Sequence, residues 1–474
     1  LNARQIAIGL AGLQSFDDQT AYQAVRMLEP ASALCLDEKG TRIWKYWKLD
    51  VHREIRFARD DDYVDAFEEI LQSAIDARMR TNGRVGFMLS GGLDATTSLA
   101  LGLRGGRQPV DRLSALSWAL REGDDWVVPD ERSYIDAFLR EYPIDHHYVV
   151  SNAARVLDVP EVVRRHGNGP EQRIDYCQMV PTLEVARACG VRVILEGSSG
   201  DLIASHNPND HVLGCLLRGD WRTLHTEAAQ HAVASGRPVW RNLAGMLRPL
   251  ARSSRLFAPI DFQWRYRRYC ERVSDLGERG IPLSQALCDE IGLVEHVRRI
   301  ARPHLPGAWR SPVRAGQIYV LTQTHVVSDQ VNAWSYSASH GVEFRNPYLD
   351  RRVVEYAVAV PPQQHRDAWQ SRRLLRRVAH RRVPEKIAQR RDKGMTMPDL
   401  GRGLVENYAR VAGWISEWRR VPAVSRFLDL DRLEADLRWV VKNTNDRSAD
   451  WAPALPLCRG VLLAKFLESM GDIT

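Results

Sequence analysis

The sequence predicts an α/β fold with a parallel sheet, a mostly helical C-terminal half and a short β-rich segment in front of the sheet. Between residues 60 and 205, short apolar runs alternate with helical patterns. Two of these runs end abruptly in glycine-rich turns, and from about residue 208 long helical segments take over. The chain has 474 residues, 44% of them apolar and 26% charged, which is ordinary for a globular protein and excludes a disordered or fibrous one.

The expected elements follow in chain order. Residues 1 to about 50 are expected to form short strands and turns, with one strand at 42–47 after the turn at 37–40. Apolar residues on one face predict a helix over 60–80. Further strands are expected at 84–89, 113–120, 146–150 and 191–195, and further helices from 94 to 101, over 132–142 and over 182–189.

Charge and cysteine usage narrow the class of protein. Lys and Arg exceed Asp and Glu by 7, with arginines clustered between residues 372 and 391. This surplus fits either anionic partners or solvated helices, and both readings stay open. The seven cysteines are widely spaced without a CxxC, so neither a disulfide framework nor a zinc site is expected, and the cytoplasm is the default location.

The N-terminus and the apolar segments predict no membrane association. No apolar stretch reaches the roughly 18 residues of a membrane span, and the first residues lack the pattern of a signal peptide. The chain begins with Leu1 rather than Met, so it is expected to start inside a longer chain or at an alternative start.

The first glycine-rich turn follows the strand expected at 84–89. Glycines let backbone N–H groups approach a phosphate closely, and a helix that begins there adds partial positive charge. Ser90, Thr96 and Thr97 offer hydroxyl donors, and Asp94 suits a Mg²⁺ that bridges phosphate oxygens. The alternative is an ordinary strand–helix turn capped by Asp94. The turn consists of Leu89, Ser90, Gly91, Gly92, Leu93, Asp94, Ala95, Thr96 and Thr97.

The second turn, from Glu196 to Asp201, follows the apolar strand expected at 191–195. In an open parallel sheet, ligands bind outside the carboxyl ends of the strands. Asp94 and Asp201 are therefore expected at the same edge of the sheet, in position to share one metal ion. A small-residue turn with an Asp cap is the alternative.

In combination, these motifs resemble a known family. Ser90 to Asp94 is similar to the SGGxDS pyrophosphate loop of the PP-loop ATP pyrophosphatases, and within that group the chain resembles the class B asparagine synthetase family. The other segments that carry the resemblance are Arg42 to Trp47 (the end of the family's glutaminase domain), Gly197 to Asp201, Gly341 to Asp350, Arg373 to Arg376, Pro384-Glu385 and Arg391 to Gly394.

The resemblance implies a two-step reaction. A carboxylate attacks the α-phosphate of MgATP to give an acyl-adenylate and pyrophosphate, and an amine then displaces AMP to form an amide. Lys393 and Ser198 would be the catalytic residues, with Lys393 and the loop amides holding pyrophosphate, and Asp94 and Asp201 would hold Mg²⁺. The implied nucleotide-binding residues are Leu89, Ser90, Gly91, Gly92, Leu93, Asp94, Thr96, Ser117, Leu120, Glu196, Gly197, Asp201 and Arg345.

The resemblance also suggests how the chain divides into domains. Residues 1–55 would be the remnant of a glutaminase-like domain, and residues 56–474 the synthetase domain. Within the latter, the nucleotide-binding part would cover about 60–205 and the helical part about 206–474.

The chain departs from the family pattern at three places. Ala95 replaces a Ser after Asp94, and Ser198 stands where the family has a Glu or Tyr near the intermediate. A serine hydroxyl cannot act as a carboxylate base at neutral pH. The first cysteine is Cys35, so no glutaminase activity is expected in this chain.

Several functions remain open within and beyond this family. The substrates would be a small-molecule or peptide carboxylate and an amine donor, with a precursor peptide or a partner protein as further candidates. Lasso-peptide cyclases and β-lactam synthetases use the same scaffold with an intramolecular amine. Outside ligase chemistry, a tRNA-modifying enzyme and a degenerate nucleotide-binding protein stay open. Nucleic acid is disfavoured because about 89 residues precede the first loop and no RNA-binding motif stands out.

Overall fold

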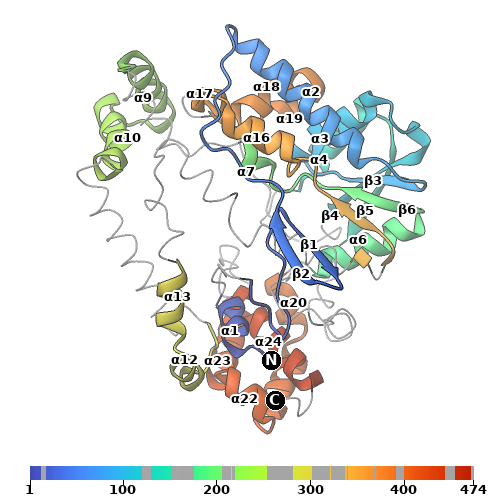
Figure 1. The fold of residues 1–474 in the computed structure, drawn as a ribbon, viewed down its shortest axis with the longest axis vertical. Helices are drawn as coiled ribbons and strands as arrows, with labels where there is room; N and C mark the ends of the chain where they lie inside the picture. Colours follow the sequence, from blue (N-terminus) through green and yellow to red (C-terminus); the bar gives the residue numbers. More distant parts are fainter. Residues whose placement is uncertain are drawn as a thin grey trace.

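In the computed structural model, the sheet and its helices occupy one end of the molecule, and the helices from residue 400 onward occupy the other (Figure 1). The structure describes residues 1–11, 18–119, 130–150, 157, 176–204, 215, 219–253, 281–301, 321, 337–338, 340–367, 370–390, 400–443 and 454–470.

The sheet has five parallel strands in the order β5-β4-β3-β6-β7. From β3 the chain builds outward to β4 and β5 and then returns to the other side of β3 with β6 and β7. The switch point of the sheet therefore lies between β3 and β6. The strands are β3 (Arg84–Met88), β4 (Leu113–Ala119), β5 (Asp145–Val150), β6 (Val191–Leu195) and β7 (Glu343–Arg345).

Alternating side chains bury both faces of the sheet. Val85 and Phe87 join one apolar cluster with the helices α2, α3, α16 and α18. Leu116 and Ile194 point to the opposite face, where α6 covers them. The helices around the sheet are α2 (Asp60–Arg78), α3 (Leu93–Gly105), α4 (Arg132–Glu141), α6 (Tyr176–Ala188), α7 (Gly200–Ala204), α16 (Arg351–Ala359), α17 (Pro362–His365), α18 (Arg373–Arg382) and α19 (Glu385–Ala388). The 3-10 turn η1 (Val110–Arg112) precedes β4, and β8 (Arg366–Asp367) pairs with β9 (Gln370–Ser371).

The structure confirms the predicted α/β class and adds one strand. Each expected strand and helix between residues 60 and 195 is present, and all lie within four residues of their predicted bounds except the helix expected over 182–189, which begins at Tyr176. The sequence did not predict β7, which is only three residues long and pairs with Val193, Ile194 and Leu195.

The arginine-rich helix α18 packs against α2. Four of its arginines form ion pairs with the acidic face of α2, so this part of the positive charge is used within the fold. The pairs are Arg373–Asp60, Arg377–Asp61, Arg381–Asp65 and Arg382–Glu68.

The first residues form a helix rather than the expected strands and turns. The side chain of Asn2 caps α1 (Ala3–Leu10) by accepting a hydrogen bond from the backbone N–H of Gln5. Because Ile6, Ala7, Ile8 and Leu10 are all buried among the C-terminal helices, the sequence shows no polar face that would mark a helix.

Helices make up most of the rest of the described chain, as predicted. One group with a common apolar core consists of α12 (Gln285–Glu290), α13 (Leu293–Ala301), α20 (Leu400–Glu406), α21 (Tyr408–Trp418), α22 (Pro422–Phe427), α23 (Leu430–Asn443) and α24 (Ala454–Met470). A separate pair consists of α9 (Trp221–Ser235) and α10 (Val239–Ser253). None of the helices within the described residues combines the length and apolar character that a membrane span needs.

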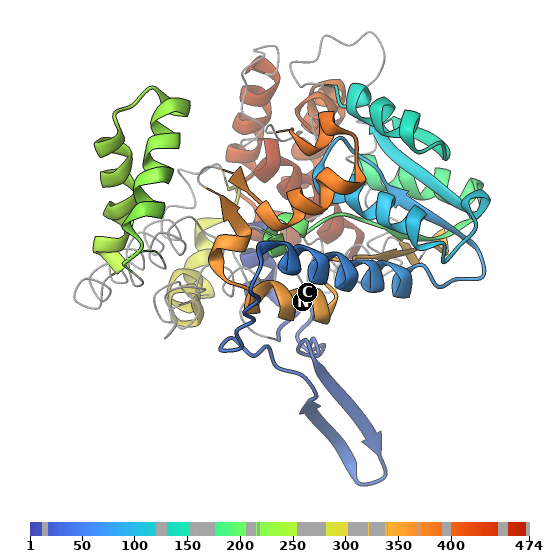
Figure 2. The same ribbon diagram turned by 90° about the horizontal axis from the view of Figure 1, so that it is seen from above.

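The N-terminal antiparallel hairpin joins β1 (Ser32–Asp37) to β2 (Gly40–Lys45). Its turn requires a glycine, because Gly40 has a φ of 113°. Figure 2 shows the hairpin projecting away from the rest of the molecule. The predicted strand at 42–47 corresponds to β2.

Candidate functional site

The two glycine-rich turns lie together at the carboxyl edge of the sheet, beside the switch point. The first follows β3 and the second follows β6, and these strands are neighbours. A Cβ atom on Gly197 would lie 2.8 Å from the backbone nitrogen of Ala95, and one on Gly200 would lie 2.5 Å from Asp94 Oδ1. Real Cβ atoms do not approach so closely, so only glycine lets the two turns meet in this way.

Backbone bonds fix the first turn at the end of β3. The N–H of Leu89 donates to the carbonyl of Leu116 on β4 (2.8 Å), and the N–H of Gly92 donates to the hydroxyl of Ser90 (3.2 Å). The hydroxyl of Thr96 donates to the carbonyl of Gly92 (2.8 Å) and its side chain is fully buried. Thr96 thus stabilises the start of α3, and Leu93 is buried beneath the turn.

Asp94 is held from two sides by residues far away in the sequence. Its Oδ2 pairs with Nη1 of Arg372 at 2.8 Å, with both side chains more than four-fifths buried. Its carbonyl accepts a hydrogen bond from the hydroxyl of Tyr348 (2.9 Å). Burial, reinforced by the charge of Asp94, raises the pKa of Tyr348, which keeps this hydroxyl protonated and donating.

Arg372 adopts a left-handed conformation, with a φ of 62°, directly before α18. A non-glycine residue at positive φ costs on the order of 1 kcal/mol or more, which favours a role for its side chain at the site.

Hydrogen bonds to the end of β7 and the residue after it hold the second turn in place. The Nδ2 of Asn346 donates to both the carbonyl (2.6 Å) and the hydroxyl (2.9 Å) of Ser198. The N–H of Glu196 donates to the carbonyl of Arg345 (3.1 Å). Since Asn346 and Tyr348 are two residues apart, one short segment fixes the positions of both turns relative to each other.

Glu131 contacts the first turn on its open side. Its Oε2 accepts a hydrogen bond from the N–H of Gly91 (3.2 Å), and its Oε1 pairs with Nη1 of Arg390 at 2.5 Å. The guanidinium of Arg390 lies over the ring of Tyr134, 4.3 Å from its centroid. Sequence reasoning missed Glu131, Tyr134, Arg372 and Arg390, because no local pattern distinguishes them. Asn346 and Tyr348 lie in the segment from Gly341 to Asp350 that carries the family resemblance, but neither was assigned to the site.

The remaining predicted residues lie in different places. Asp201 is in the first turn of α7, next to Gly200, which contacts Asp94. Ser117 is buried on β4, with its Oγ 2.9 Å from Nε2 of His146. Burial and the neighbouring His147 lower the pKa of His146. Leu120 and Lys393 lie outside the described residues, and their roles stay predictions.

The structure does not bring the side chain of Arg345 to the two turns. Its guanidinium donates to the carbonyls of Arg78 (2.8 Å), the last residue of α2, and of Arg80 (2.9 Å), just beyond it, and pairs with Glu343. Only its backbone contacts the second turn, through Glu196.

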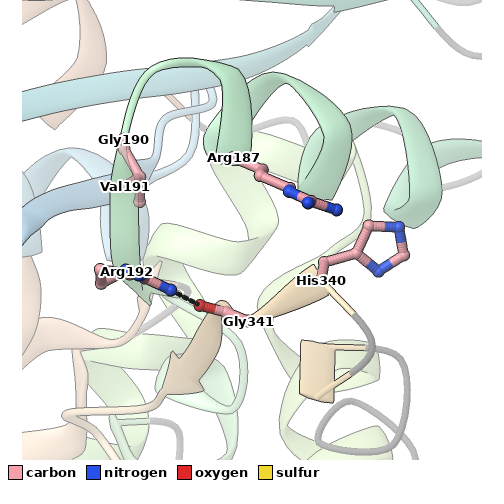
Figure 3. Close-up of a pocket in the computed structure, with 6 residues that line it drawn as sticks. All are labelled: Arg187, Gly190, Val191, Arg192, His340 and Gly341. Carbon is pink, nitrogen blue, oxygen red and sulfur yellow. Dashed lines mark hydrogen bonds between the residues drawn. The ribbon is translucent and has the colours of Figure 1, made fainter.

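Two solvent-open hollows lie at the opposite, amino edge of the sheet. One, of about 440 Å³, is lined by Arg187, Arg192 and His340 beside the start of β6 (Figure 3). The other, of about 570 Å³, lies beside Thr81 and Arg345. Ligands of open parallel sheets bind at the carboxyl ends of strands, so the two turns are the better candidate site.

Comparison with known proteins agrees with this geometry. The model of the family described as asparagine synthase matches residues 66–462. Among curated proteins, asparagine synthetase (glutamine-hydrolyzing) 3 of Bacillus subtilis (strain 168) is 26% identical over 147 residues. That match covers 29% of this chain and 23% of the relative's length.

Proposed function

Because the chain belongs to the asparagine synthase family, we propose that it is an ATP-dependent ligase that joins a carboxylate to an amine. One observation carries the proposal: two glycine-rich turns meet at the switch point of a parallel sheet, where Gly197 and Gly200 make the close contact possible. This arrangement places the amino end of α3 in the first turn, and a helix N-terminus suits the phosphates of a nucleotide.

In the proposed reaction, a carboxylate oxygen attacks the α-phosphorus of ATP and the bond to the β-phosphate oxygen breaks. Negative charge grows on the leaving pyrophosphate, where the first turn and the amino end of α3 stabilise it. The amine nitrogen then attacks the acyl carbon of the adenylate, AMP leaves, and the amine gives up a proton. The product is an amide, and ATP has been converted to AMP and pyrophosphate.

The donors at the site fit a magnesium ion in chemical type. Mg²⁺ prefers carboxylate oxygens together with the oxygens of substrate phosphates. Asp94 and Asp201 are the residues that would hold it, and the contact of Gly200 with Asp94 brings their two turns together. When bound, the ion would neutralise charge on the phosphate oxygens.

We assign the hydroxyl of Ser198 a donating role at the reacting groups. Because the Nδ2 of Asn346 donates to the Oγ of Ser198, the hydroxyl's own hydrogen is directed elsewhere. Ser198 therefore acts as a hydrogen-bond donor and not as the base that removes the amine proton.

Exchange of radiolabelled pyrophosphate into ATP tests the adenylation step. We expect exchange with at least one of three substrate groups: aspartate, β-amino acids or precursor peptides. Asp94→Asn should reduce exchange at least tenfold, because it weakens both the ion pair with Arg372 and the metal site. Asp145→Asn removes a carboxylate from the Arg84–Asp145 pair at the other edge of the sheet and should not affect exchange in a chain that stays folded.

The same screen separates the competing functions. Exchange supported only by peptides points to a macrocyclase, whereas exchange with aspartate points to asparagine formation. Tight MgATP binding without exchange for any substrate would refute the ligase proposal and favour a nucleotide-binding relative. Salt-sensitive binding of tRNA would favour a nucleic-acid-directed enzyme instead.

A further inference from the structure

The contact between Glu131 and the first turn resembles an anion-binding site in which the Glu131 carboxylate is the bound anion. Two donors converge on one carboxylate, the backbone N–H of Gly91 and the guanidinium of Arg390. A backbone amide of a glycine-rich turn and a guanidinium are the two kinds of donor that proteins use most for phosphate oxygens.

Arg390 is held rigidly against the turn. Its side chain is only 3% exposed, whereas that of Glu131 is 24% exposed. A Cβ atom on Gly91 would lie 2.4 Å from Nη1 of Arg390, so the guanidinium contacts the glycine directly. Behind it, Nη1 of the buried Arg376 donates to the carbonyl of Arg390 (2.9 Å), which fixes the backbone that carries the guanidinium.

A purely structural ion pair does not require this placement. An arginine that only links α19 to α4 has no need to touch a loop glycine, and burying a charged side chain carries a desolvation cost that an ion pair often fails to repay. Lys386 already links the same elements, since its ammonium donates to the carbonyl of Ser133 (3.0 Å) and lies over the ring of Tyr134.

We propose that Arg390 binds the pyrophosphate portion of the nucleotide, and that the Glu131 carboxylate occupies this anion site until phosphate oxygens displace it. This inference rests on the proposed function. In the ligand-free chain, Glu131 neutralises Arg390, and Asp94 neutralises Arg372. Phosphate binding exchanges one anion for another at Arg390, so the internal carboxylate lowers the apparent affinity for the nucleotide.

Calorimetric titration of the full chain with inorganic pyrophosphate and Mg²⁺ tests this exchange. Removing the competitor with Glu131→Ala should tighten pyrophosphate binding about threefold to tenfold. Arg390→Ala should weaken it at least tenfold, because a charge-assisted hydrogen bond to phosphate is lost. Arg390→Lys keeps the positive charge but loses the planar, paired N–H donors of the guanidinium. Its pyrophosphate affinity should lie between those of Arg390→Ala and the wild type.

The double variant and a remote pair serve as controls. Glu131→Ala combined with Arg390→Ala should bind only slightly more tightly than Arg390→Ala alone, because without Arg390 the Glu131 carboxylate competes for the Gly91 amide but for no cation. Glu131→Gln keeps the size and one acceptor oxygen, and should give a smaller gain than Glu131→Ala. Asp145→Ala breaks the Arg84–Asp145 pair at the far edge of the sheet and should leave pyrophosphate binding unchanged.

Two results would overturn the inference, and they are distinguishable. If the wild type binds pyrophosphate and both Glu131→Ala and Glu131→Gln, still folded, bind it equally or more weakly, then Glu131 supports the turn and is no competitor. If the wild type binds neither pyrophosphate nor MgATP, the proposed function itself fails, and the inference fails with it.

Discussion

Replacing Gly197 by alanine tests whether the two turns must lie as close as they do. The new Cβ would lie 2.8 Å from the backbone nitrogen and 3.0 Å from the Cα of Ala95, whereas ordinary contact begins at 3.4 Å. Both neighbours are backbone atoms of the first turn, so no side chain can rotate away. The turns must therefore separate by about 0.5 Å, and overpacking of this kind costs about 1 to 3 kcal/mol of unfolding free energy.

Function should suffer more than stability. A displacement of about 1 Å at a reacting centre can cost on the order of 100-fold in rate, so a shift of about half that should cost about tenfold. We expect Gly197→Ala to lower MgATP affinity or pyrophosphate exchange by about that factor. The melting temperature should fall by several degrees, because the overpacking also destabilises the sheet.

A matched glycine elsewhere gives the control. Gly413 lies within α21 and a Cβ atom there would have nothing within 4 Å. Gly413→Ala should raise stability by about 0.5 to 1 kcal/mol and leave nucleotide binding unchanged. A folded Gly197→Ala chain with wild-type MgATP affinity and exchange would refute the argument that the close approach of the turns is needed.

Three further predictions concern residues that hold the site. Tyr348→Phe removes the hydrogen bond to the Asp94 carbonyl, and should cost about 1 kcal/mol in chemical denaturation and severalfold in exchange; an unchanged exchange rate would contradict it. Arg372→Ala leaves the Asp94 carboxylate without this cation, and should lower the Mg²⁺ concentration needed for half-maximal exchange, because both cations use that carboxylate; a higher requirement would show that Arg372 positions Asp94 for the metal and does not compete with it. Asp350→Asn should cost about 2 to 3 kcal/mol at neutral pH, because Asp350 pairs with Arg78 and Arg352. Burial alone would raise the pKa of Asp350, but these hydrogen bonds outweigh burial and hold the pKa below its usual range. Its contribution is therefore present above about pH 4 and is lost as the pH falls through the folded-state pKa, so acid unfolding of the variant should show a weaker pH dependence in this range.

The parallel sheet could be predicted largely because its central strands carry a local signal. The runs that became β3 and β6 are apolar, of strand length and end in glycine. The strand β7 carries no such signal, since Phe344 is its single fully buried residue and the pairing partner lies about 150 residues earlier in the chain. The helix α1 was missed for the opposite reason, because burial on all sides removes the polar face on which periodicity depends.

The residues of the site also fall into those that the sequence predicts and those that it does not. Its glycines and Asp94 could be predicted because the chemistry lies within consecutive residues after a strand. The residues that hold them could not, because Tyr348 and Arg372 reach Asp94 across 254 and 278 positions of sequence. Contacts at such separations depend on the tertiary fold, which no local pattern specifies.

The arginine-rich segment shows which arginines a helical repeat assigns to ion pairs within the fold. Arg373, Arg377 and Arg381 recur every four residues and thus share one face of α18, where each meets a carboxylate of α2. Arg372 and Arg390 lie outside that series and are largely buried beside the first turn. The net charge of the segment could not reveal this division. Its spacing reveals part of it, because arginines in a four-residue series matched by an acidic helix are neutralised within the fold. Arg382 lies outside the series and still pairs with Glu68, so the spacing narrows the candidates for anion binding and the tertiary contacts decide among them.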